Sequence, residues 1–141
     1  MTDQSILRGL TTVAYQASDL EAAKGWYTEL LGVEPYFQRP EYIEFRIGDY
    51  QHEFGILDSR YLPDLGAGGS AADQPGGAIV YWHVDDVPSL LERLQQMGAK
   101  LHHPPRDFGE GFVGASVIDP FGNVLGIMHN PHYLEVLESR G

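Results

Sequence analysis

The chain has 141 residues, of which 43% are apolar, and its 9 basic and 20 acidic side chains give a net charge of −11. This length suits one ordinary domain or two very small halves that share a core, and the apolar content excludes extensive disorder. The acidic charge argues against a nucleic acid or an anionic membrane as partner, and the absence of cysteine excludes disulfides and thiolate metal sites. No stretch approaches the roughly 18 consecutive apolar residues of a membrane span, so we expect a soluble, cytoplasmic protein.

The first half of the chain, residues 1–65, has the pattern of one strand, one helix and three further strands. Residues 10–17 (LTTVAYQA) read as a strand. Ser18 and Glu21 match the S-x-x-E capping box of a helix that should end at Gly32. Three extended segments follow, at residues 35–38, 42–47 and 51–57.

The second half, residues 78–130, repeats this pattern after a Gly-, Ser- and Ala-rich stretch at residues 66–77, which reads as a flexible linker or a flap. A strand at residues 78–84 precedes a helix that opens at Asp86 and stops at Gly98. Extended segments are expected at residues 100–103, 112–118 and 123–129, with a turn at residues 119–122 (DPFG). His102 and His103 precede two prolines and are expected in a solvent-exposed loop, and the tail, residues 131–141, has near-helical apolar spacing.

The repeat determines the expected fold class. Asp19 and Asp86 stand at the same place in the two halves, so Thr12 corresponds to Ile79. A βαβββ unit of this size is too small to bury both faces of its own sheet, so two such modules should pack together. We therefore expect an α+β protein that forms one domain from two βαβββ modules.

The sequence resembles the vicinal oxygen chelate superfamily, which includes glyoxalases, bleomycin-resistance proteins and extradiol dioxygenases. The resemblance rests on Asp19 to Gly32, on Val84 to Val87 and above all on Asp119 to Asn123, and it extends from about residue 8 to residue 130. It implies two curved mixed sheets around a cavity.

The resemblance also implies four positions for metal ligands, one on the first and one on the last strand of each module. In this chain those positions hold Thr12, Glu53, Ile79 and Gly126. Only Glu53 is an ordinary ligand, because a divalent ion needs several oxygens or imidazoles. We therefore expect no metal and no other cofactor.

Two polar residues stand out as candidates for acid–base chemistry. Glu53 is expected to face the cavity, where burial would make it a possible general acid or base unless Arg46 or a ligand cation pairs with it. His83 shares strand parity with Ile79 and Tyr81, and it is either a second such group or a structural histidine. His129 should face away from the cavity by the same parity. The expected ligand-binding set is Thr12, Glu53, Ile79, Tyr81, His83, Gly126 and Met128.

Three functional hypotheses remain open from the sequence. The first is a metal-independent protein, similar to the bleomycin-resistance type, that binds an apolar or aromatic small molecule in the cavity, where Gly126 would leave room for a bulky ligand. The second is a glyoxalase-like lyase or isomerase that uses Glu53 and His83, or that holds a divalent metal at other residues. The third is a structural or regulatory protein with an unused cavity. A homodimer is expected in each case, and the sequence does not identify the ligand.

Overall fold

The computed structural model describes residue 6 and residues 10–61 and 79–140. The chain divides into two units, Met1–Tyr61 and Leu62–Gly141, and each is described by itself. The predicted linker at residues 66–77 lies outside the described residues, and so does the boundary at residue 65.

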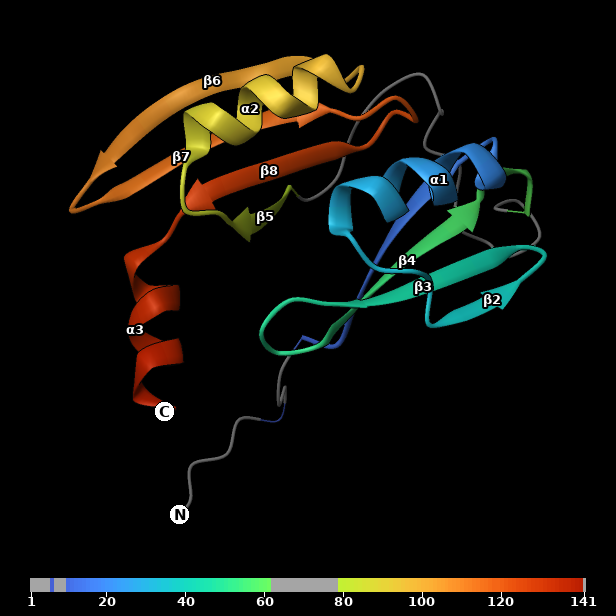
Figure 1. Cartoon of the computed structure of the whole chain (residues 1–141), viewed down its shortest axis with the longest axis horizontal. Coiled ribbons are helices and arrows are strands. Elements are labelled where there is room, and N and C mark those ends of the chain that lie inside the picture. Colours follow the sequence, from blue (N-terminus) through green and yellow to red (C-terminus); the bar gives the residue numbers. More distant parts are fainter. Residues whose placement is uncertain (1–5, 7–9, 62–78, 141) are drawn as a thin grey trace. The chain divides into compact units, whose positions relative to one another are not determined.

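The first unit is a four-stranded mixed sheet with one long helix. Its elements are β1 (Thr12–Ala17), α1 (Leu20–Leu31), β2 (Phe37–Arg39), β3 (Tyr42–Ile47) and β4 (His52–Asp58), followed by a 3-10 turn at Ser59–Tyr61. The strand order is β1-β4-β3-β2 (Figure 1). β1 runs parallel to β4, and the other neighbours are antiparallel.

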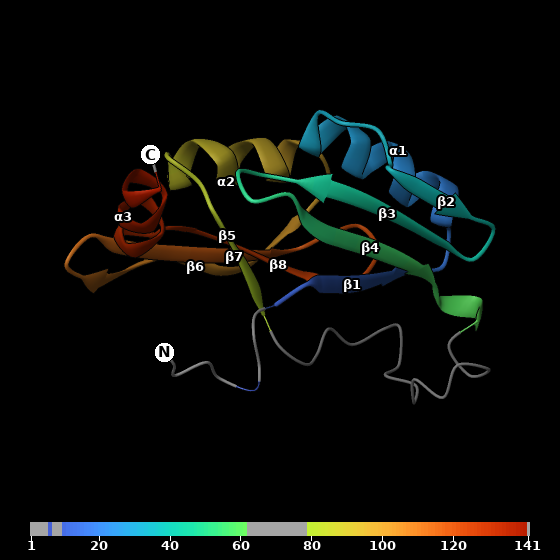
Figure 2. The same ribbon diagram turned by 90° about the horizontal axis from the view of Figure 1, so that it is seen from below.

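The second unit repeats this topology and adds a C-terminal helix. It contains β5 (Val80–His83), α2 (Val87–Gln96), β6 (Lys100–Gly109), β7 (Phe112–Ile118), β8 (Val124–His129) and α3 (Pro131–Ser139). The strand order is β5-β8-β7-β6, with only β5 and β8 parallel (Figure 2). The predicted α+β fold of two βαβββ modules is therefore confirmed.

Each unit has a hydrophobic core between its helix and one face of its sheet. In the first unit the rings of Tyr15 and Tyr27 pack against Phe54, with centroids 5.0 and 5.1 Å from it. In the second unit Leu91 and Leu94 of α2 are buried with Val117 and Ile127 of the sheet. Alternate residues of every strand point to the opposite face, which no helix of the same unit's βαβββ repeat covers. We call it the open face.

The start of α1 differs from the predicted capping box. The N-cap is Asp19, not Ser18, and its carboxylate accepts a hydrogen bond from the backbone N–H of Ala22 at 3.0 Å. Asp86 caps α2 in the same way through Ser89. A carboxylate at this position also interacts favourably with the positive end of the helix dipole, which explains why Asp is preferred over the preceding Ser.

The extended segment predicted at residues 100–103 is confirmed, whereas the loop expected for His102 and His103 is wrong. These residues lie in β6, which continues to Gly109, rather than in a loop. β6 is an edge strand, where Pro104 and Pro105 are tolerated because one row of N–H groups needs no partner. Its pairing with β7 is irregular, with register shifts after Leu101, His103 and Asp107.

The predicted turn between β7 and β8 is confirmed. The carboxylate of Asp119, only 3% exposed, accepts hydrogen bonds from the backbone N–H groups of Phe121 and Asn123 at 2.9 and 2.8 Å. This network joins β7 and β8, the two central strands of the second sheet.

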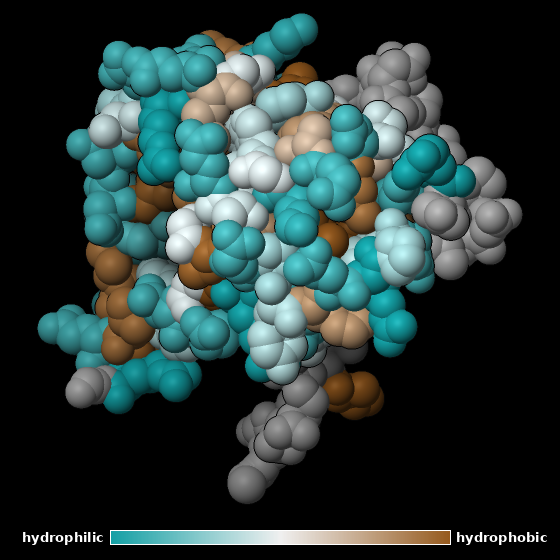
Figure 3. Space-filling view, turned by 45° about the vertical axis from the view of Figure 1, so that its right-hand side comes forward, coloured by the Kyte–Doolittle hydropathy of each residue, from teal (hydrophilic) through white to brown (hydrophobic). Residues whose placement is uncertain are grey.

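Within the described residues, no helix has the length and apolar character needed to cross a bilayer. On the face shown in Figure 3, hydrophobic residues form small groups between hydrophilic ones.

We predict that the two residues at the start of α1 differ in their contribution to stability. Asp19→Ala should lower the free energy of unfolding by about 1 kcal/mol, because the Ala22 N–H loses its acceptor. Ser18→Ala is the matched control and should change it by less than about 0.5 kcal/mol. Urea denaturation followed by circular dichroism measures both, and equal losses would contradict the assignment of Asp19 as the cap.

Candidate functional site

The open face of the first sheet brings together two of the residues selected from the sequence. Thr12 of β1 and Glu53 of β4 are direct neighbours in the parallel ladder. The Thr12 hydroxyl donates a hydrogen bond to Glu53 Oε1 at 2.6 Å. Glu53 is half-buried, while its chain neighbour Phe54 lies in the core on the other side.

Arg46, the alternative partner expected for Glu53, has a different contact. Arg46 and Glu53 are opposite each other in the antiparallel ladder of β3 and β4. The guanidinium carbon of Arg46 nevertheless lies 3.9 Å from the centre of the Tyr36 ring, a cation–π geometry. Among the residues that the structure describes, no ion pair joins Arg46 to Glu53.

Tyr42 belongs to the same face and was missed by the sequence reasoning. Its ring covers Gly55, where an added Cβ would clash with the Tyr42 hydroxyl oxygen. That hydroxyl donates to Glu44 Oε1 at 2.9 Å. Burial, this hydrogen bond and the charges of Glu44 and Glu53 raise the pKa of Tyr42 to about 12. Strand parity was the available signal, since Tyr42 and Glu44 alternate with the buried Ile43 and Phe45.

The open face of the second sheet carries the other selected residues. Tyr81 of β5 stands opposite Gly126 of β8, and His83 stands opposite Met128. A Cβ on Gly126 would lie 2.6 Å from Cδ1 of Tyr81. The space that Gly126 leaves is therefore occupied by the Tyr81 ring, and the expectation that it would leave room for a bulky ligand is wrong.

A second ring lies beside Tyr81. A Cβ on Gly114 of β7 would be 3.4 Å from Cε2 of Phe108 and 3.7 Å from Cε1 of Tyr81. Tyr81 is 44% exposed and Phe108 is 59% exposed. We call these two rings, resting on the backbone of Gly114 and Gly126, the aromatic platform.

His83 occupies the end of β5, and both of its ring nitrogens have partners. Nδ1 accepts the backbone N–H of Asn130 at 3.1 Å, and Nε2 lies 3.2 Å from Oδ1 of Asp85. The ring stacks on Tyr133 of α3, with centroids 4.9 Å apart. In this arrangement neither nitrogen is free to exchange a proton with a substrate, which favours the structural interpretation of His83.

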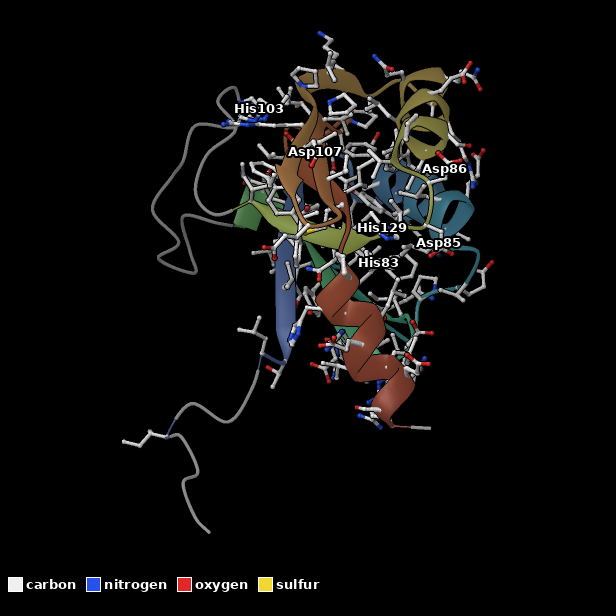
Figure 4. The ribbon with its side chains drawn as sticks, turned by 90° about the vertical axis from the view of Figure 1, so that its left-hand side faces the viewer. His83, Asp85, Asp86, His103, Asp107 and His129 are labelled. Carbon is white, nitrogen blue, oxygen red and sulfur yellow. The ribbon has the colours of Figure 1, made fainter. Side chains whose placement is uncertain are left out.

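The ring of His129, expected on the other face, has its centroid 5.3 Å from that of His83. Figure 4 shows the two rings grouped with Asp85 where the chain leaves the sheet for α3. The alternation of faces therefore does not separate these two side chains at the strand end.

The donor set at the four positions suggested by the resemblance does not fit a metal ion. Thr12 and Glu53 form a hydrogen-bonded pair in the first unit. In the second unit, Ile79 has a hydrocarbon side chain and Gly126 has no side chain. One carboxylate and one hydroxyl are too few ligands for a stable divalent site. Across the described part of the chain, no cluster of three or more His, Asp or Glu residues has a geometry suited to a metal ion.

We predict that Tyr42 ionises well above the ordinary tyrosine range. Because the pKa of about 12 in the folded state exceeds the ordinary tyrosine value of 10.0, Tyr42 contributes stability below pH 10 that is lost as the pH rises toward 12. Ultraviolet titration of phenolate absorbance, with Tyr42→Phe subtracted to remove the other seven of the 8 tyrosines, measures this pKa. Glu44→Gln should lower it, and an unchanged value in that variant would contradict the assigned hydrogen bond.

The comparisons with known proteins agree with this architecture. The family model of the Glyoxalase/Bleomycin resistance protein/Dioxygenase superfamily matches residues 9–127. A glyoxalase-related enzyme from Fulvimarina pelagi has a similar structure, with 26% identity, a TM-score of 0.69, and coverage of 89% of this chain and 90% of that one. No curated protein matched the chain.

Two more distant structures show the same fold. One is a glyoxalase/bleomycin resistance protein/dioxygenase family enzyme from Burkholderia phytofirmans PsJN, which is 19% identical to this chain with a TM-score of 0.67. The match covers 84% of this chain and 96% of that chain. The other is lactoylglutathione lyase from Agrobacterium tumefaciens, which is 20% identical with a TM-score of 0.64. The match covers 86% of this chain and 93% of that chain. The match to the family model over residues 9–127, together with the repeated βαβββ topology, shows that this chain belongs to the glyoxalase/bleomycin resistance protein/dioxygenase superfamily, the vicinal oxygen chelate group that its motifs resemble.

Proposed function

We propose that this protein binds an aromatic or apolar small molecule without a metal, and that the ligand contacts the open face of the second sheet. The observation that carries the proposal is the aromatic platform, where Tyr81 and Phe108 remain substantially exposed although each ring is supported by glycine backbone. Exposed rings held in place present a large apolar area at low entropic cost. Such a surface favours stacking of a second planar group.

The surroundings of the platform support an apolar ligand. Met128 lies on the same face as Gly126, two residues further along β8, and Ile79 precedes β5. A thioether and a branched alkyl group add adaptable hydrophobic contacts. Metal independence is supported by the donor set described above, because Glu53 is the one ordinary ligand at the four positions.

We predict that N-phenyl-1-naphthylamine, a neutral aromatic probe, binds the folded protein. Its fluorescence titration should show affinity weakened about fivefold to tenfold by Tyr81→Leu, because the stacking contact is lost. Tyr36→Leu is the matched control, since Tyr36 is 61% exposed but contacts Arg46 in the other unit. Equal affinity in the wild type and Tyr81→Leu, with unchanged thermal melting, would overturn the assignment of the platform.

A second candidate function is a glyoxalase-like lyase or isomerase in which Glu53 acts as acid or base. The observation that favours it is the half-buried carboxylate of Glu53, which is held by the Thr12 hydroxyl and faces Tyr42 without an ion-pair partner among the described residues. His83 would take part only if it released Asn130 or Asp85.

We predict that Glu53→Gln abolishes any turnover found with 2-oxoaldehyde thiohemiacetals, because the amide does not accept a proton at neutral pH. Thr12→Val is the companion variant, which removes the hydrogen bond but leaves the carboxylate, and it should retain measurable activity. Turnover that is unchanged in Glu53→Gln would remove Glu53 from the mechanism. Turnover restored only by an added divalent metal would contradict metal independence.

A homodimer and a cytoplasmic location remain predictions. The dimer is supported by α3, in which no residue is buried and Val136 is 39% exposed.

A further inference from the structure

The irregular pairing of β6 brings two consecutive histidines to one acceptor. Nδ1 of His102 lies 3.0 Å from the Ser116 hydroxyl oxygen, and Nδ1 of His103 lies 3.3 Å from the same atom. Consecutive residues of a regular strand point to opposite faces. The register shift between Leu101 and His103 removes this alternation, as β-bulges do where a side chain is re-aimed.

Ser116 accommodates a proton on Nδ1 of either imidazole. Its side chain is fully buried, and its oxygen has two lone pairs and one proton. It therefore accepts Nδ1–H from one ring and donates its own proton to Nδ1 of the other, neutral ring, whose centroid is 4.1 Å away. His83 is different, because its Nδ1 accepts a backbone N–H and protonation would break that bond.

The two charged residues of β6 that follow this histidine pair, Arg106 and Asp107, already have contacts of their own. β7 carries no charged residue. On β6, the Arg106 guanidinium lies over the Phe108 ring at 5.2 Å, and the Asp107 carboxylate accepts the N–H of Gly109 at 2.8 Å. In the part of the chain that the structure describes, no carboxylate forms an ion pair with either histidine. The other charged or titratable groups on neighbouring elements are Lys100 at the start of β6, Glu110 in the turn between β6 and β7, and His129 at the end of β8. Glu92 and Arg93 belong to α2, which packs on the other face of the sheet.

The histidine pair adjoins the aromatic platform. Ser116 and Gly114 are two residues apart on β7, so they share one face with a spacing of about 7 Å. Gly126, which supports Tyr81, is the ladder partner of Ser116. Arg106, whose guanidinium lies over the Phe108 ring, is the ladder partner of Gly114. Figure 4 places His103 and Asp107 along β6. Arg106 and the two histidines thus border one side of the aromatic platform.

We propose that the ligand of the aromatic platform is an aromatic acid whose anionic group binds His102 and His103, assisted by Arg106. This inference rests on the proposed function and defines its ligand class. Hydrogen bonds from protonated imidazoles to an anion are charge-assisted, so they are stronger than those to a neutral polar group. Histidine ordinarily changes charge between about pH 5 and pH 8, so binding of the anion should strengthen as the pH falls through that range.

The test uses two probes with the same ring system. N-phenyl-1-naphthylamine is neutral, whereas 8-anilino-1-naphthalenesulfonate carries an anionic group. We expect the sulfonate to bind about tenfold more tightly at about pH 5.5 than at about pH 8, and the neutral probe to change less than about twofold. His102→Gln/His103→Gln should remove the pH dependence of the sulfonate and leave the neutral probe unaffected. His132→Gln, an exposed histidine of α3, is the matched control and should behave as the wild type.

The outcomes separate the inference from the proposed function. If both probes bind and the double variant leaves sulfonate affinity unchanged, or if only the neutral probe binds, the acid-binding inference is overturned while the platform stands. If neither probe binds, the proposed function fails together with the inference. If the double variant does not melt cooperatively, the test is the pH dependence of the two probes on the wild-type protein. A sulfonate affinity that tracks the neutral probe at every pH would then overturn the inference.

Discussion

A four-stranded sheet has two faces, and the single helix within each βαβββ repeat covers only one of them. This constraint arises from the alternation of side chains along a strand, which sends Phe54 and Ile56 toward α1 while Glu53 and Gly55 point the other way. The helix side is filled by apolar residues and provides the hydrophobic free energy of the unit. The open face does not form this core, so polar, aromatic and glycine residues can occupy it without reducing the apolar area that the helix buries.

Glycine residues determine where aromatic rings lie on the open faces. At Gly55 the missing side chain lets Tyr42 lie flat on the backbone, and at Gly114 and Gly126 it does the same for Phe108 and Tyr81. The two faces nevertheless differ in chemistry. The first combines a tyrosine with two carboxylates and a threonine hydroxyl, and burial together with the two carboxylates raises the pKa of Tyr42. The second combines exposed rings with histidines and an arginine, which suits an apolar ligand with an anionic group.

Three histidines of the second unit, His83, His102 and His103, illustrate how one residue type takes different roles. His83 contacts the first turn of α3 through Asn130 and Tyr133, so its ring has a structural role. His102 and His103 share a buried serine and keep their Nε2 atoms on the other side of each ring. Members of this superfamily share the scaffold, but function depends on the side chains of the open faces. In this chain those side chains supply one ordinary metal ligand at the four expected positions.

The sequence by itself determined the repeat, the fold class and most element bounds, because helix periodicity, caps and the Asp119 turn are local signals that act over a few residues. Parity also placed Thr12 with Glu53 and Tyr81 with Gly126 on common faces. The N-cap at Asp19 differed by one residue, since two adjacent residues were both good caps. The tertiary structure alone decided that Tyr81 fills the space over Gly126, that Arg46 turns to Tyr36, and that a bulge brings His102 and His103 to Ser116. Each of these depends on the register between strands and on the direction of side chains, which residues distant in the chain set together and no local pattern encodes.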